Sequence, residues 1–155
     1  MATRAETNVP ITRVTHVTIA VSDMERSVAF YRKVLGWKQI DDTQVDLTAL
    51  APVVGPNATC RALVGRVANF GVELICGSFI PNVRPTRGLG ISIVAVEVPD
   101  AQAAYERLVA MGLTPLNQPG LVHGVKMFQI EDPDGQRVEF CEYARGDCPW
   151  DRPAQ

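Results

Sequence analysis

Several features that mark common functions are scarce in this chain of 155 residues. Histidine occurs only twice, aromatic residues make up 6% of the chain, and the formal net charge is −2 without any basic block. No apolar run approaches the roughly 18 residues that a membrane-spanning helix needs. Because binding along a phosphate backbone requires a positively charged surface, we expect neither nucleic acid nor a membrane as a partner.

The cysteines do not form a recognisable site. No C-x-x-C pair occurs among Cys60, Cys76, Cys141 and Cys148. The first ten residues, MATRAETNVP, lack the apolar segment of a signal peptide, so we expect a cytoplasmic protein whose cysteines are buried thiols. The chain also lacks a G-x-S-x-G motif, and with so few histidines available as a base, nucleophilic catalysis by serine or cysteine is poorly supported.

Residues 15–37 contain a strand that leads directly into a helix. The strand has alternating apolar residues, Val17, Ile19 and Val21. Alternation places His16 on the opposite face, away from the packing layer. The S-x-x-E motif that begins at Ser22 predicts a capping box, and Gly36 is placed to end the helix.

The same pattern recurs 77 residues later, about half a chain length away. Ile93 takes the place of His16, Asp100 precedes a predicted helix that reaches Met111, and Gly112 ends that helix. An internal repeat of strand, capped helix and glycine predicts two modules of the same architecture.

The remaining segments complete each module with further strands. We predict strands over 37–40, 59–67 and 70–76 in the first half, and over 113–114, 125–130 and 137–143 in the second. Loops are predicted over 44–57 and 117–124, and a turn over 131–135. Alternation places Glu73 and Glu139 each on the side of its strand that is opposite to the apolar residues.

The predicted fold is α+β, with two tandem βαβββ modules whose curved sheets enclose a central cavity. The expected divisions are an N-terminal tail (1–13), the first module (14–77), a linker (78–89), the second module (90–143) and a C-terminal tail (144–155). Four open-face positions line the cavity in this interpretation, namely His16, Glu73, Ile93 and Glu139.

At these positions the sequence resembles the vicinal oxygen chelate superfamily, the group of glyoxalases, bleomycin-resistance proteins and extradiol dioxygenases. The resemblance rests on the runs HVTIAVSD at 16–23, SVAFY at 27–31 and VEL at 72–74, and on DPDGQRVEF at 132–140. It covers residues 14–143. It implies the paired-module fold, whereas the reaction depends on the residues of the site.

The resemblance implies a divalent metal held by one residue from the first and one from the last strand of each module. Those positions carry His16, Glu73 and Glu139, and the fourth carries Ile93, which cannot bind a metal. One imidazole and two carboxylates balance the charge of a divalent ion and leave positions for water or substrate. Such donors suit Zn, Fe, Mn, Co or Ni without selecting among them.

An alternative interpretation is that these three residues are polar walls of a pocket that binds no metal. Two carboxylates that face one cavity without a cation repel each other, and one then takes up a proton. This cost favours a metal.

Other polar residues are weaker candidates. His123 is either a general base, a replacement ligand or a solvated loop residue. Glu97 shares the face of Ile93 and is either an acid/base group at the cavity rim or the solvated end of a strand. Arg61 and Lys126 are candidates to hold an anionic substrate.

The leading functional hypothesis is a small metal-dependent lyase, epimerase or isomerase. It would move a proton next to a metal-chelated carbonyl of a small-molecule substrate, with Glu139 or Glu73 as the base. The first alternative is a metal-free, drug-sequestering binding protein, and the second is a metal-free biosynthetic isomerase or cyclase that uses cavity carboxylates. An extradiol dioxygenase is less consistent with the sequence. The resemblance implies an iron site with two histidines and one carboxylate for that branch, and this chain has no histidine at the second-module position.

A homodimer is the expected assembly, because exposed strand edges in such modules commonly pair across a two-fold axis. The sequence leaves open whether a site forms within one chain or between two chains. It does not identify the substrate.

Overall fold

The computed structural model describes residues 13, 15–51, 55–80 and 93–144. The first half contains, in order, β1 (His16–Ala20), α1 (Met24–Leu35), β2 (Lys38–Asp46), the short 3-10 helix η1 (Thr48–Leu50), β3 (Thr59–Val67) and β4 (Phe70–Gly77). The second half contains β5 (Ile93–Glu97), α3 (Ala101–Ala110), β6 (Gly120–Val122), β7 (Val125–Glu131) and β8 (Arg137–Glu142). The predicted linker and the two predicted tails lie almost entirely outside the described residues.

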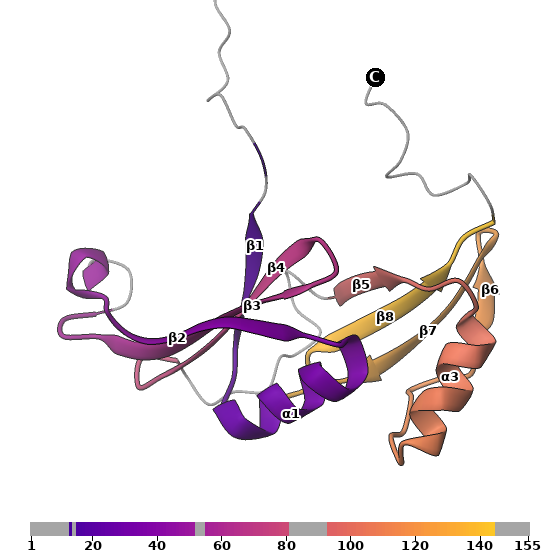
Figure 1. Ribbon diagram of the computed structural model, residues 1–155, viewed down its shortest axis with the longest axis horizontal. Helices are drawn as coiled ribbons and strands as arrows, with labels where there is room; N and C mark the ends of the chain where they lie inside the picture. The colour runs from indigo at the N-terminus through magenta and orange to yellow at the C-terminus, as the bar shows by residue number, and fades with distance from the viewer. Residues whose placement is uncertain (1–12, 14, 52–54, 81–92, 145–155) are drawn as a thin grey trace, which may run out of the picture.

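The two halves form separate four-stranded sheets with the same strand order, β1-β4-β3-β2 and β5-β8-β7-β6. In each sheet the first strand pairs in parallel with the last, which requires the intervening helix as a crossover, and the other pairings are antiparallel. The predicted α+β fold of two tandem modules is confirmed. The two sheets do not close on each other within the described part of the chain, and α1 lies between them (Figure 1).

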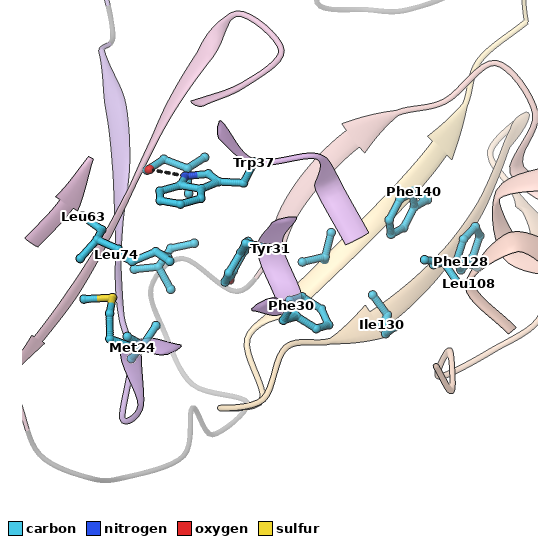
Figure 2. Close-up of a cluster of buried hydrophobic side chains, with 14 of the residues drawn as sticks. Met24, Phe30, Tyr31, Trp37, Leu63, Leu74, Leu108, Phe128, Ile130 and Phe140 are labelled. Carbon is cyan, nitrogen blue, oxygen red and sulfur yellow. Dashed lines mark hydrogen bonds between the residues drawn. The ribbon is translucent and has the colours of Figure 1, made fainter. Parts of the chain in front are cut away.

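The apolar sides of both sheets meet in one core. The residues predicted to face inward from the first strand pack there: Ile19 of β1 and Val21, which follows β1, are both buried. Figure 2 shows Phe30 and Tyr31 of α1 between side chains of the first sheet and side chains of the second, such as Phe140. The helix therefore contributes apolar surface to both modules, which burial in a shared core stabilises.

Both helices begin at an aspartate. The carboxylate of Asp23 accepts a hydrogen bond from the backbone N–H of Arg26 at 2.9 Å, and Asp100 caps α3 in the same way. The predicted capping box is therefore wrong, because Ser22 is occupied elsewhere, donating its hydroxyl hydrogen bond to Asp134. The predicted end of α1 is confirmed, since Gly36 has a left-handed φ of 63° and its N–H bonds back to the last turn.

Three local predictions of strands and loops differ from the structure. β2 extends well beyond residue 40, because β3 offers it a pairing edge as far as Asp46, and the predicted loop over 44–57 therefore begins inside a strand. The predicted strand over 113–114 does not form. Instead β6 forms inside the predicted loop over 117–124, because it pairs with β7 in a hairpin. In each case cross-strand pairing outweighs local propensity.

Hydrogen bonds fix the second module against α1. The hydroxyl of Tyr31 donates to Asp132 at 2.9 Å, and the guanidinium of Arg26 donates to Asp134 at 3.0 Å. The ammonium of Lys33 donates to the carbonyl of Met111 at 2.8 Å. In the described residues, neither helix is long and apolar enough to cross a membrane.

Candidate functional site

Two predicted site residues meet on the open face of the first sheet, meaning the face that α1 does not cover. His16 on β1 and Glu73 on β4 approach to 3.9 Å between Nε2 and Oε2. The hydroxyl of Thr18 donates to the same carboxylate oxygen at 2.7 Å, and the hydroxyl of Thr15 lies 2.8 Å from Nδ1 of His16. The neighbouring threonines thus orient both side chains.

The spacing of this pair is compatible with a shared metal ion. Ligand atoms at about 2.1 Å from an ion are at most about 4.2 Å apart, and the observed 3.9 Å falls within that limit. The side chain of His16 is half exposed and that of Glu73 is 23% exposed, so solvent or a substrate reaches both. The pair offers one nitrogen and one carboxylate donor to an ion.

Glu139 occupies the open face of the second sheet, the face that α3 does not cover. The amide of Gln129 donates to its carboxylate at 2.7 Å, and the thiol of Cys141 lies 3.4 Å from its other oxygen. Ala95 on β5 is the register partner of Glu139. Ile93, two residues before Ala95, pairs with Arg137. On β5, Glu139 therefore faces Ala95, which is flanked on the same face by Ile93 on one side and Glu97 on the other.

One chain does not bring the three predicted ligands together. Within the described ranges, no group of three His, Cys, Asp or Glu side chains is placed to hold a metal ion. His16 and Glu73 form a candidate two-donor half-site on one sheet, and Glu139 is a single candidate donor on the other. A complete three-ligand site therefore does not fit one chain as it stands.

A cavity of about 350 Å³ lies beside the His16–Glu73 pair. Its lining side chains include Arg13, Thr15, Ile40, Val64, Arg66 and Asn69. Sequence reasoning missed the two arginines. Alternation along β3 carried the signal for Arg66, because every second residue counted from Ala62 faces the same side.

The structure corrects the prediction that Arg61 and Lys126 hold an anionic substrate. Arg61 makes two hydrogen bonds to Asp42, at 2.8 and 3.0 Å, and a third to Glu25 of α1. These bonds raise the pKa of its guanidinium and lower the pKa of both carboxyl groups. Lys126 lies 3.8 Å from Glu142, whose carboxylate also accepts from the first N–H of α3. Both cations therefore face the helices.

His123 lies at an exposed hairpin turn between β6 and β7. It has a φ of 48° and the following Gly124 a φ of 83°, the left-handed pair of a two-residue hairpin turn. Gln129, the register partner of Glu139, is four residues beyond Val125, or roughly 13 Å along the strand. His123 therefore does not reach Glu139 within the chain. Glu97 is exposed and shares the face of Ile93, as predicted.

The remaining site prediction concerned the thiols. Cys60 and Cys141 are buried and Cys76 is half-buried, in agreement with buried thiols, while Cys148 lies outside the described residues. Burial raises the pKa of the Cys60 thiol, and the nearby charge of Glu73 raises it further. A thiol kept protonated in this way is a poor nucleophile.

The fold and the site together define a class: a small α+β protein of paired βαβββ modules that carries imidazole and carboxylate donors on the open faces of its sheets. Residues 13–140 match the family described as the Glyoxalase/Bleomycin resistance protein/Dioxygenase superfamily. The chain belongs to this superfamily.

Known proteins similar to this chain agree with that assignment. A lactoylglutathione lyase of Neisseria meningitidis is 30% identical over 139 residues, which cover 87% of this chain and 94% of the relative. A lactoylglutathione lyase of Salmonella typhimurium is 29% identical over 84% of this chain and 92% of its own length. A glyoxalase family protein from Bacillus cereus has a similar structure, with a TM-score of 0.71, 17% identity, and coverage of 89% of this chain and 98% of that one.

Proposed function

We propose that this protein is a small glyoxalase-like enzyme, a lyase or isomerase that moves a proton on the carbon next to a carbonyl. The observation that carries the proposal is the His16–Glu73 pair, 3.9 Å apart on an open face and beside a cavity. Similarity to lactoylglutathione lyases over most of the chain supports this reaction class. A small-molecule substrate is consistent with the size of the cavity.

We infer that the site is completed by a second copy of the chain. Because one chain separates the His16–Glu73 half-site from Glu139, a homodimer in which the two sheet faces meet would unite three donors around a divalent ion. The candidate ions are Zn, Fe, Mn, Co and Ni, whose nitrogen and oxygen ligands these residues provide. Such an ion, when bound, polarises the carbonyl oxygen of a substrate. The place of the fourth ligand is taken by Ile93.

The proton transfer is assigned to the carboxylates. Glu139 is held by the amide of Gln129 at 2.7 Å, and Glu73 is held by the hydroxyl of Thr18 at 2.7 Å. Each hydrogen bond holds its carboxylate in one position. Either carboxylate is therefore prepared to act as the base, and a fixed position shortens the path of the proton.

Ile93 favours one alternative function. A metal-free binding protein would also have an apolar residue in place of a metal ligand. It would keep the cavity but would not catalyse a reaction. Such a protein would bind a small molecule tightly without converting it. The two functions differ in whether the purified protein contains a metal.

The test is elemental analysis of protein purified without an immobilised-metal column. We expect near-stoichiometric divalent metal in the parent and its loss in His16→Ala. The matched control is His123→Asn, which removes the other histidine while asparagine tolerates the left-handed backbone at that turn. Absence of metal from the parent, even after incubation with Zn, Mn, Fe, Co and Ni salts, would favour the binding protein over the enzyme.

A further inference from the structure

We propose that the cavity beside His16 and Glu73 has an anion-binding end, formed by Arg66 and Arg13, that holds a carboxylate or phosphate group of the substrate. This inference rests on the proposed function for the role of the other end of the cavity. It adds a substrate class: an acidic molecule whose charged group lies several bonds away from the reacting carbonyl.

The strand register places Arg66 and His16 in one row across the sheet. Arg66 on β3 pairs with Gly71 on β4, and Gly71 pairs in turn with His16 on β1. Side chains at paired positions share a face, so Arg66 and His16 both belong to the open face. Two strand spacings separate their backbones by about 10 Å.

Gly71, which lies between these two residues in the row, allows β1 to approach β4 closely. A Cβ atom at this position would lie 2.7 Å from the Cβ of His16 and 2.6 Å from the carbonyl oxygen of Thr15, closer than real Cβ contacts. The close approach of β1 thus requires a glycine here. The position between Arg66 and His16 in this row therefore carries no side chain.

The charges of Arg66 and Arg13 are available to a ligand. Neither guanidinium has a hydrogen-bond or ion-pair partner among the described residues, although both line the cavity. By contrast, Arg26 is paired with Asp134, and Arg61 with Asp42 and Glu25. The planar guanidinium presents parallel N–H donors that match the two oxygens of a carboxylate or phosphate.

The rest of the lining agrees with an extended acid. Ile40 and Val64 provide apolar contact, and Asn69 and Thr15 provide hydrogen-bonding groups. Glu73 adds negative charge, but Thr18 and His16 already engage it at the other end. The cavity lining therefore combines two guanidinium groups with the His16–Glu73 pair, so a substrate with unlike ends can contact both.

The experiment measures binding of two probes, inorganic phosphate and glutarate, to the purified protein by amide chemical shifts in NMR spectra. We expect one or both probes to shift the amides of Gly71 and Arg66. We also expect Arg66→Gln to weaken that binding about tenfold, with a smaller loss in Arg66→Lys, because charge remains while the forked geometry is lost. Arg107→Gln, on the exposed side of α3, is the matched control and should bind as the parent does.

The probes and variants also separate this inference from the proposed function. Preference for phosphate would indicate a phosphorylated substrate, and preference for glutarate a carboxylic acid. In His16→Ala the probes should still bind even when metal is lost, so the anion-binding end is tested whether or not the enzyme proposal survives. Binding of neither probe, or equal binding by Arg66→Gln and Arg107→Gln, would overturn the inference.

Discussion

Tyr31 and Asp132 form a buried hydrogen bond that joins the two modules, with the phenolic hydroxyl donating to the carboxylate at 2.9 Å. The other oxygen of Asp132 accepts from the backbone N–H groups of Asp134 and Gln136, at 2.9 and 2.8 Å. One carboxylate therefore shapes the turn between β7 and β8 and attaches that turn to α1. Burial raises the pKa of both Tyr31 and Asp132.

Removing the hydroxyl in Tyr31→Phe should destabilise the protein. The substitution preserves the packing of the ring but leaves one oxygen of Asp132 buried without its partner, which costs about 1–3 kcal/mol. Urea denaturation measures the change in the free energy of unfolding. The control is Tyr105→Phe, whose ring packs against Phe128 and whose hydroxyl has no hydrogen-bond partner among the described residues. Equal loss in both variants would mean that the bridge to Asp132 contributes nothing specific.

The stability of the fold should also depend on the protonation of Asp132. Burial is the largest cause that raises its pKa above the ordinary value of 3.8, so the folded state holds this proton more tightly than the unfolded state. The stabilisation from that proton is fully present below pH 3.8 and is lost as the pH rises through the folded pKa.

Asp132→Asn does not titrate and tests this dependence. We expect the free energy of unfolding of the variant, relative to the parent, to rise with pH from about 3.8 upward. Urea denaturation at a series of pH values measures the difference. A fall over the same range would show that the hydrogen bonds from Tyr31, Asp134 and Gln136 outweigh burial and lower the pKa instead.

The true helix cap provides a third prediction. Asp23→Ala removes the acceptor for the N–H of Arg26 and should cost about 1 kcal/mol of unfolding free energy. Glu25→Ala tests the discarded capping box, because it removes the side-chain oxygen that would accept from the backbone N–H of Ser22. Because Glu25 instead binds Arg61, that variant should leave the cap intact. A larger loss of helix content in Glu25→Ala than in Asp23→Ala would favour the capping box over the cap at Asp23.

The sequence predicted those features that depend on local pattern. Alternation alone placed His16, Glu73 and Glu139 opposite the apolar residues of their strands, and the repeat predicted two modules. Features set by distant partners escaped prediction. Ser22 was assigned to the helix cap because nothing nearby indicates Asp134, and Arg61 was assigned to the cavity because its partner Asp42 lies on another strand.

The arrangement of the site shows the same limit. Period-2 alternation tells which face a donor occupies but not which faces meet, because that depends on how whole sheets pack. His16 and Glu73 lie on one sheet and Glu139 on the other, with α1 between the sheets. This arrangement results from how the two modules pack and is not encoded in any one strand. The sequence alone leaves open whether one chain or two chains complete the site. A homodimer that shares its sites can be tested directly.

Mixed dimers test whether two chains share a site. In a dimer of His16→Ala with Glu139→Gln, one of the two shared sites loses both residues. The other keeps His16 and Glu73 from one chain and Glu139 from its partner. Co-expression with two different non-metal affinity tags isolates this heterodimer, and elemental analysis should find about half the metal content of the parent.

The control for this experiment pairs two changes on the same sheet. A heterodimer of His16→Ala with Glu73→Gln damages both shared sites, because each half-site draws its His16 and Glu73 from one chain, so it should contain little metal. A site built within one chain would be damaged in every chain of either mixture, and neither heterodimer would recover metal. Recovery in the first mixture but not in the second therefore requires that Glu139 reach across to the His16–Glu73 pair of its partner. Failure of both, with a metal-containing parent, would place all the ligands on one chain and require the sheets to rearrange around α1.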